Sequence, residues 1–219
     1  MFADDAFRLR PGLSFRFETI AEGLPVMLVD GLYERPDELR EEALSLDYAP
    51  APFDYPGRVA RMPAPNPSLT IFLRELLGLV NAQYLPRVPI AADGRRIANF
   101  HTVRTDFAIV DVHPDDLRPP QRTPHIDPIP IFGLVYLNRE ERGGTLFFEK
   151  LDASRPEPAS NAYLTESGSG YALRGRIEAA FNRLAIYPGF VPHSAEIGRW
   201  IESEERFTRP RLTQRLMFF

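Results

Sequence analysis

Apolar and polar positions follow a helical period in the first part of the chain, with one strand-like run before it. Residues 24–33 (LPVMLVDGLY) are rich in strand formers, and residues 35–48 have a proline and acidic residues where a helix begins. Apolar residues at helical spacing predict a helix over residues 68–85, with Ser68 as its N-cap. Six prolines between residues 50 and 67 predict a loop or surface arm there.

The pattern changes after the turn expected at Asp93-Gly94, where short strand-like runs are separated by proline and glycine. These runs cover residues 96–103, 106–112, 131–138, 144–150, 183–189 and 211–219. Strands without interleaved helices predict an antiparallel sandwich or barrel. An irregular insertion is expected at residues 151–180, with a helix near residues 172–181. We therefore expect one mainly β domain with flanking helices, in which residues 1–95 support a core formed by residues 96–219.

Composition narrows the classes of function. The chain has 219 residues, 44% of them apolar and 26% charged, which is typical of a soluble globular domain. Acidic and basic residues are interspersed and sum to a net charge of -4, so neither nucleic acid nor a membrane surface is an expected partner. No run is long and apolar enough to span a bilayer, and the expected location is cytoplasmic. Without cysteine, any metal must be held by nitrogen and oxygen atoms.

One cluster of residues suggests such a metal site. His125 and Asp127 are two residues apart at the start of a predicted strand, so their side chains point to the same face. His193 follows the predicted strand at residues 183–189 and offers a third ligand. Two histidines and one carboxylate with open positions opposite are the ligand set of non-haem Fe(II) oxygenases.

The other histidines are weaker candidates. His113 and Asp115 repeat the same spacing, but the prolines around them indicate a surface turn. His101 lies within a strand-like run, where a packed or hydrogen-bonded histidine is the simpler interpretation.

The order of segments from residue 99 onward resembles the prolyl-hydroxylase-like branch of the Fe(II)/2-oxoglutarate-dependent dioxygenase superfamily. The segments are HID, FGLVYLN, ERGGTLFFE, NRLAIYPGFVPHSA and RLTQRLMFF. The resemblance implies a double-stranded β-helix, which is a jelly-roll, cupin-like barrel. It also implies Fe(II) bound by His125, Asp127 and His193, with 2-oxoglutarate as cosubstrate.

The resemblance further implies a cation for the far carboxylate of 2-oxoglutarate, and arginine suits a carboxylate because it can donate two parallel hydrogen bonds. Arg211, Thr213 and Arg215 share one face of the last predicted strand. Arg211 with Thr213 matches the family pattern and is the first candidate, and Arg215 is the second. Both arginines could instead be exposed on an edge strand.

The function implied by the resemblance is hydroxylation of a small-molecule or protein substrate with dioxygen. Superfamily halogenases replace the carboxylate ligand with a small residue, so Asp127 disfavours halogenation. Two alternatives stay open: a jelly-roll module that binds a ligand or protein without turnover, and a zinc-dependent hydrolase with the same ligands. The sequence indicates neither the substrate nor the oligomeric state.

Overall fold

A computed structural model describes residues 2–20, 23–51, 54–62, 65–88, 99–139, 143–152, 163–197 and 210–219. Its two α-helices are α1 (Pro36–Leu44) and α2 (Pro67–Leu79), which continues as a π-helical turn over Val80–Tyr84. Its strands are β1 (Phe15–Ile20), β2 (Leu24–Asp30), β3 (Ala49–Pro50), β4 (Arg58–Arg61), β5 (Val103–Val110), β6 (Ile131–Tyr136), β7 (Thr145–Lys150), β8 (Tyr171–Ile177), β9 (Arg183–Pro188), β10 (His193–Ala195) and β11 (Arg211–Phe218). The expectation of a mainly β fold with flanking helices is confirmed.

These strands form two antiparallel sheets, as the strand pattern predicted. The large sheet has eight strands in the order β1-β2-β9-β6-β11-β5-β4-β3, and the small sheet has three in the order β10-β7-β8. All nine strand pairings described are antiparallel. Strands from the N-terminal part lie at both edges of the large sheet, so residues before and after position 96 share one sheet.

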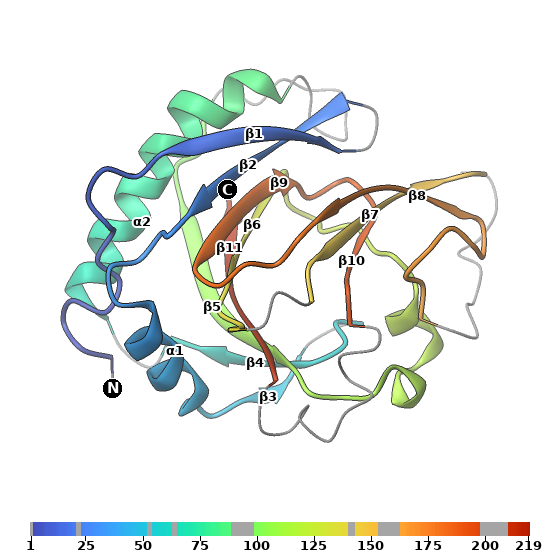
Figure 1. Cartoon of the computed structure of the whole chain (residues 1–219), viewed down its shortest axis with the longest axis horizontal. Helices are drawn as coiled ribbons and strands as arrows, with labels where there is room; N and C mark the ends of the chain where they lie inside the picture. The colour runs from blue at the N-terminus through green and yellow to red at the C-terminus, as the bar shows by residue number, and fades with distance from the viewer. Residues whose placement is uncertain are drawn as a thin grey trace.

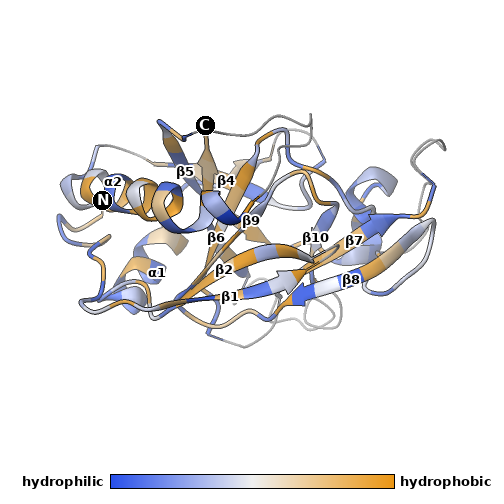
Figure 2. Cartoon of the chain, turned by 90° about the horizontal axis from the view of Figure 1, so that it is seen from above, coloured by the Kyte–Doolittle hydropathy of each residue, from blue (hydrophilic) through white to orange (hydrophobic). Residues whose placement is uncertain are grey.

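The large sheet separates two apolar clusters. On one face, α1, α2 and the N-terminal residues cover a cluster that includes Met27, Ile186 and Leu216. On the other face, Phe132 of β6 packs in a cluster with Phe147 of the small sheet. Figures 1 and 2 show the two helices on one side of the curved large sheet and β7, β8 and β10 on the other.

Strand β11 lies in the middle of the large sheet, between β5 and β6. Its alternate residues Leu212 and Leu216 join the cluster on the helix side. Arg211 and Arg215 point the other way, into a cavity between the sheets. The edge-strand alternative for these two arginines is therefore wrong.

The helix predicted near residues 172–181 is wrong, because the chain forms β8 there and pairs with β7. The segment has good helix formers, but Gly175 would cost about 1 kcal/mol in a helix interior. In β8 the absence of a side chain at Gly175 lets the strand approach Ile20, whose Cβ would lie 3.2 Å from an added Cβ. Pairing with β7 therefore overrides the local preference.

Two smaller expectations also differ. Part of the proline-rich segment is β4, which pairs with β5, so the segment is not only a loop. The N-cap of α2 is Asn66 rather than Ser68: its side chain accepts a hydrogen bond from the backbone nitrogen of Leu69 at 3.1 Å. Pro67 then takes the first helical position, where its missing N–H costs nothing. The turn expected at Asp93-Gly94 lies outside the described residues.

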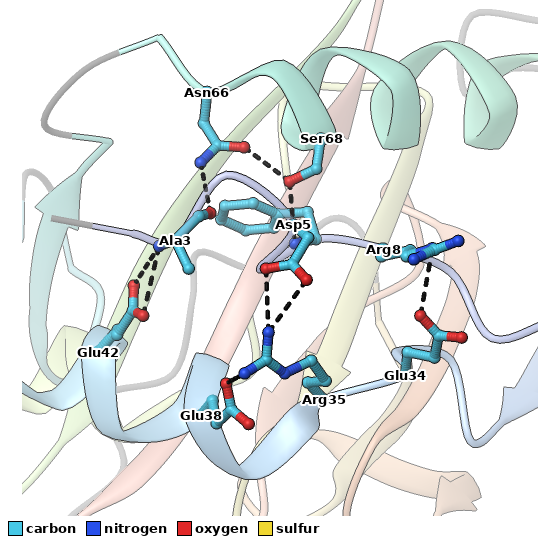
Figure 3. Close-up of polar contacts among 10 residues, drawn as sticks. Ala3, Asp5, Arg8, Glu34, Arg35, Glu38, Glu42, Asn66 and Ser68 are labelled. Atoms are coloured by element: carbon cyan, nitrogen blue, oxygen red, sulfur yellow. Dashed lines mark hydrogen bonds and ion pairs between the residues drawn. The ribbon is translucent and has the colours of Figure 1, made fainter.

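The N-terminal residues are tied to both helices (Figure 3). The backbone nitrogen of Ala3 donates to the Glu42 carboxylate of α1 at 3.0 Å, and Asn66 donates to the carbonyl of Ala3 at 2.9 Å. The backbone nitrogen of Phe7 donates to Ser68 at 3.1 Å. These bonds hold the helices against the large sheet, on the side away from the cavity.

None of the helices within the described ranges is long and apolar enough to cross a membrane.

Candidate metal centre

His125 and His193 lie side by side because their backbones pair. Each residue's N–H donates to the other's carbonyl, at 2.9 and 2.8 Å, and the ring centroids are 4.6 Å apart. His193 begins β10, which pairs with β7 of the small sheet. The two histidines, separated by most of the C-terminal half of the sequence, therefore meet at the end of this sheet.

Asp127 is held against the end of β9. Its backbone nitrogen donates to the carbonyl of Gly189 at 2.8 Å. A Cβ on Gly189 would lie 2.3 Å from the carbonyl oxygen of Ile129, so only glycine permits this close approach. One ligand atom from each of His125, Asp127 and His193 lies within 4.8 Å of the others. The three residues that the sequence proposed as ligands thus form one group that could hold a metal ion.

The hydrogen bonding of His193 fits such a role. Its Nδ1 lies 2.8 Å from the carbonyl oxygen of Val191, so in the neutral ring Nδ1 carries the proton and Nε2 carries the lone pair. Nε2 lies 3.2 Å from Oδ2 of Asp127. Oδ2 is buried and has no hydrogen-bond partner among the described residues. Two acceptor atoms at this distance require a cation between them or a proton on the ring.

The spacing is close to that of a metal site. Ligands about 2.1 Å from a metal in adjacent octahedral positions are roughly 3.0 Å apart. The separation of 3.2 Å between His193 and Asp127 already matches this geometry. All three ligand atoms lie within 4.8 Å of one another. The donor set therefore fits a divalent metal that accepts nitrogen and oxygen ligands.

Electrostatics keep these ligands in the protonation state that binds metal. Burial, with a smaller contribution from His193, lowers the pKa of His125 to about 4. Burial acts to raise the pKa of Asp127, but its contacts with the two histidines and the charge of Arg215 outweigh burial and lower it. At neutral pH His125 is neutral and Asp127 is ionised, so neither must lose a proton to bind a metal.

The three residues line a cavity of about 40 Å³ between the two sheets. This space is small but can hold ordered water, which needs roughly 10–15 Å³ by the same measure. Tyr55, Thr145, Arg211 and Arg215 also line the cavity. Two cations therefore lie in the same small space as the metal-ligand group.

Arg211 is buried, and both of its hydrogen bonds to described residues are to backbone carbonyls. Its Nε donates to the carbonyl of Gly143 at 2.6 Å and its Nη2 to that of Gly144 at 3.3 Å. Gly143 has φ +78°, and a Cβ there would lie 3.1 Å from Cδ of Arg211. No described carboxylate lies within ion-pair distance of Arg211. Nearby, the Thr213 hydroxyl is buried and has no hydrogen-bond partner in the described part of the chain.

Arg215, in contrast, has a carboxylate partner. Its Nε and Nη2 donate to the two oxygens of Asp106, both at 2.6 Å, and its guanidinium lies 5.1 Å from the ring centroid of Tyr55. Of the two arginines, Arg211 is the one whose charge is not neutralised by a described side chain. The assignment of either arginine to 2-oxoglutarate stays a prediction.

The remaining histidines lie away from this group. His113 precedes a 3-10 turn (Pro114–Asp116), and its Nδ1 accepts a hydrogen bond from the backbone nitrogen of Asp115 at 3.2 Å. The expected surface turn is therefore confirmed. His101 is exposed and precedes β5, so of the two expected arrangements, packed or hydrogen-bonded within a strand, the packed one is wrong. Its backbone N–H donates to the carbonyl of Phe219 at 2.8 Å, two residues before β5 begins.

Tyr55 is a cavity residue that the sequence did not indicate. Its hydroxyl is buried without a hydrogen-bond partner among the described residues. Gly57, two residues further along the chain, explains how the loop enters the sheet, because an added Cβ would lie 2.0 Å from the carbonyl oxygen of Ile109. A tyrosine between prolines is only a weak signal, since nothing local places it beside β11.

Comparison with curated proteins found no match. A family model matches residues 11–156 and 149–218, which together cover most of the chain. The protein therefore belongs to DUF6445, which is described as a family of unknown function.

Proposed function

We propose that this protein is an oxygenase that uses Fe(II) and 2-oxoglutarate, built on a double-stranded β-helix. One observation carries the proposal. Two histidines and a carboxylate meet in a cavity that also holds Arg211, a buried cation without a described carboxylate partner. A metal site and an unneutralised cation in one cavity suit a cosubstrate that chelates metal at one end and carries a carboxylate at the other.

The order in which the chain visits the two sheets supports the jelly-roll part of the proposal. From β5 onward the chain runs from the large sheet to the bridge at His125 beside β10, then back to β6 in the large sheet. It continues through β7 and β8 in the small sheet, β9 in the large, β10 in the small and β11 in the large. Such alternation between two facing antiparallel sheets is expected of a jelly roll, in which the strands of one barrel are divided between two sheets.

The residues that line the cavity have different roles in the proposed reaction. His125, Asp127 and His193 would hold the metal, and Fe(II) with 2-oxoglutarate supplies the activation of dioxygen for oxidation of a carbon–hydrogen bond. Arg211 would bind the far carboxylate, and the free hydroxyl of Thr213 would donate one more hydrogen bond. The apolar walls formed by Phe132 and Tyr187 exclude water from the reacting groups.

Cosubstrate binding requires side-chain movement. 2-Oxoglutarate is much larger than the water that a cavity of about 40 Å³ can hold. Arg211 can release the carbonyls of Gly143 and Gly144 when a carboxylate becomes available. An ion pair between the guanidinium and a carboxylate is stronger than the hydrogen bonds from the same guanidinium to neutral carbonyls. We therefore expect 2-oxoglutarate to open the cavity as it binds.

An anaerobic titration tests the proposal. Fe(II) and 2-oxoglutarate together should give the weak visible charge-transfer band of the chelate, and aerobic turnover should convert 2-oxoglutarate to succinate. Both signals should disappear in His193→Ala. They should persist in His113→Ala, which removes a histidine from the surface copy of the same motif.

The outcomes separate the alternatives. A zinc-dependent hydrolase would bind metal at the same three residues but give no band and no succinate with Fe(II). A binding module without turnover would give no succinate either, even with the metal bound. Either result would contradict the proposed oxygenase.

A further inference from the structure

A second, larger pocket lies on the other side of His125. It has a volume of about 520 Å³, within the range of roughly 300–1,000 Å³ common for small-molecule sites. Among the described lining residues, His125 is the one shared by this pocket and the inner cavity. We call the larger space the outer pocket.

Several residues that line the outer pocket are also neighbours of the proposed metal ligands in the sequence. Pro124 and Ile126, which line it, flank His125, and Pro192, which also lines it, precedes His193. A molecule in this pocket would therefore lie beside two of the three proposed ligands. No other pocket described in the structure has this position.

The walls are mainly apolar and are held in place. Pro119, Pro120, Pro124, Pro192, Ile126 and Tyr171 contribute to them. The Thr123 hydroxyl donates to the carbonyl of Pro119 at 3.2 Å. Gln121, in the same 3-10 turn as Pro119, donates to the carbonyl of Tyr55 at 3.0 Å, which ties this wall to the inner cavity. Proline-rich walls lose little conformational freedom when a ligand binds.

The carboxylate and the ammonium group in the lining of the outer pocket already have partners. Asp54 forms an ion pair with Arg118 at 3.1 Å, and Lys150 also has a partner. In contrast, Ile126 exposes 59% of its surface although it is a large apolar residue next to a metal ligand. The unpartnered buried hydroxyl of Tyr55 and carboxylate oxygen of Asp127 belong to the inner cavity. The inner cavity is therefore suited to a polar ligand, and the outer pocket is suited to an apolar ligand.

We propose that the outer pocket is the substrate site and that it takes an apolar small molecule with an aromatic or branched hydrocarbon part. Its role as the substrate site rests on the proposed oxygenase function, whereas binding of an apolar ligand can be tested without iron. Burial of Ile126 and the proline rings by such a ligand would supply the main free energy of binding. A nucleotide or sugar would leave its polar groups unpaired against these walls.

A fluorescent probe tests this assignment. N-phenyl-1-naphthylamine, which is neutral and aromatic, should bind the full chain at a single saturable site and gain fluorescence. Ile126→Lys should weaken binding at least about tenfold, because a charge would be buried under the ligand. Pro120→Lys, at another exposed residue of the lining, should weaken it as well. The control is Ile71→Lys, since Ile71 on α2 is also exposed, at 47%, but lies outside the pocket.

Equal affinity of the probe for the wild type and both pocket variants would overturn the inference, as would displacement of the probe by adenosine. The charge-transfer band with Fe(II) and 2-oxoglutarate should survive in Ile126→Lys, because its side chain lines only the outer pocket. Loss of probe binding with the band retained supports the site. If the wild type binds the probe at this site but gives no charge-transfer band, the apolar ligand site is supported and only the proposed oxygenase function is contradicted.

Discussion

Replacement of Arg211 by methionine tests how the cavity binds its cosubstrate. Methionine keeps much of the length of the side chain and removes the guanidinium. If Arg211 binds the far carboxylate of 2-oxoglutarate, the variant loses charge-assisted hydrogen bonds with a combined contribution of about 1.5–3 kcal/mol. At about 1.4 kcal/mol per tenfold change, this corresponds to a Kd for 2-oxoglutarate that is roughly 10–150-fold higher.

Arg211 also has a structural role, and the two effects must be separated. Its loss leaves the buried carbonyl of Gly143 without its described donor, at a cost of about 1–3 kcal/mol in folding stability, whereas the carbonyl of Gly144 keeps a hydrogen bond from the backbone nitrogen of Glu196 at 2.9 Å. The assay is therefore calorimetric titration of 2-oxoglutarate into folded, Fe(II)-loaded protein under anaerobic conditions, with the fold checked by circular dichroism. Iron affinity should stay unchanged, because Arg211 is not among the three proposed ligands.

Arg215 supplies the matched comparison. Arg215→Met alone would leave the carboxylate of Asp106 unpaired at a cost of about 3–5 kcal/mol, so the double variant with Asp106→Leu is used instead. This double variant should bind 2-oxoglutarate with nearly the affinity of the wild type. A folded Arg211→Met protein with unchanged affinity, or a greater loss in the double variant, would refute the assignment of Arg211.

Further predictions concern the metal ligands and the packing of the sheets. Because burial lowers the pKa of His125 to about 4, the unfolded chain binds more protons between that pH and about 6.5. The metal-free protein should therefore lose stability as pH falls through this window in urea denaturation; an equal slope in His125→Gln would contradict this origin. Asp127→Asn should weaken Fe(II) binding at least about tenfold in equilibrium dialysis, because the neutral amide loses the charge attraction; unchanged binding would exclude Asp127 as a ligand. Gly144→Ala should lower the midpoint of urea denaturation, because its Cβ would lie 2.0 Å from the carbonyl oxygen of Ile177. Gly78→Ala, in α2 with nothing within 4 Å of the added Cβ, should be neutral or stabilising by up to about 1 kcal/mol, and an equal loss in both variants would refute the packing argument.

The sequence predicted the parts of the fold that depend on local apolar patterns. The run that forms β6 is almost continuously apolar, and the run that forms β11 alternates between polar and apolar residues. Both strands lie inside the large sheet. The same alternation placed Arg211 and Arg215 on one face, as the structure has them. The spacing of His125 and Asp127 also indicated a shared ligand site before the backbone pairing with His193 was known.

Features set by distant contacts could not be predicted in this way. β8 has helix-forming residues and becomes a strand because β7 offers it a partner. Tyr55 enters the cavity because β4 pairs with β5, which no local pattern near Tyr55 shows. The neutralisation of Arg215 by Asp106 depends on the register between β11 and β5, in which these two residues lie opposite each other. Pairing between strands far apart in sequence therefore explains both the wrong helix prediction at β8 and the cavity contacts that the sequence did not indicate.

Anaerobic metal titration tests the central claim most directly, namely that His125, Asp127 and His193 bind one divalent metal ion together. The wild type and His113→Ala should each bind one equivalent of Fe(II) with the same affinity. Substitution of any one of the three ligands by alanine should remove tight binding while the protein stays folded. Full binding of Fe(II) by a folded variant that lacks His193 would contradict the account.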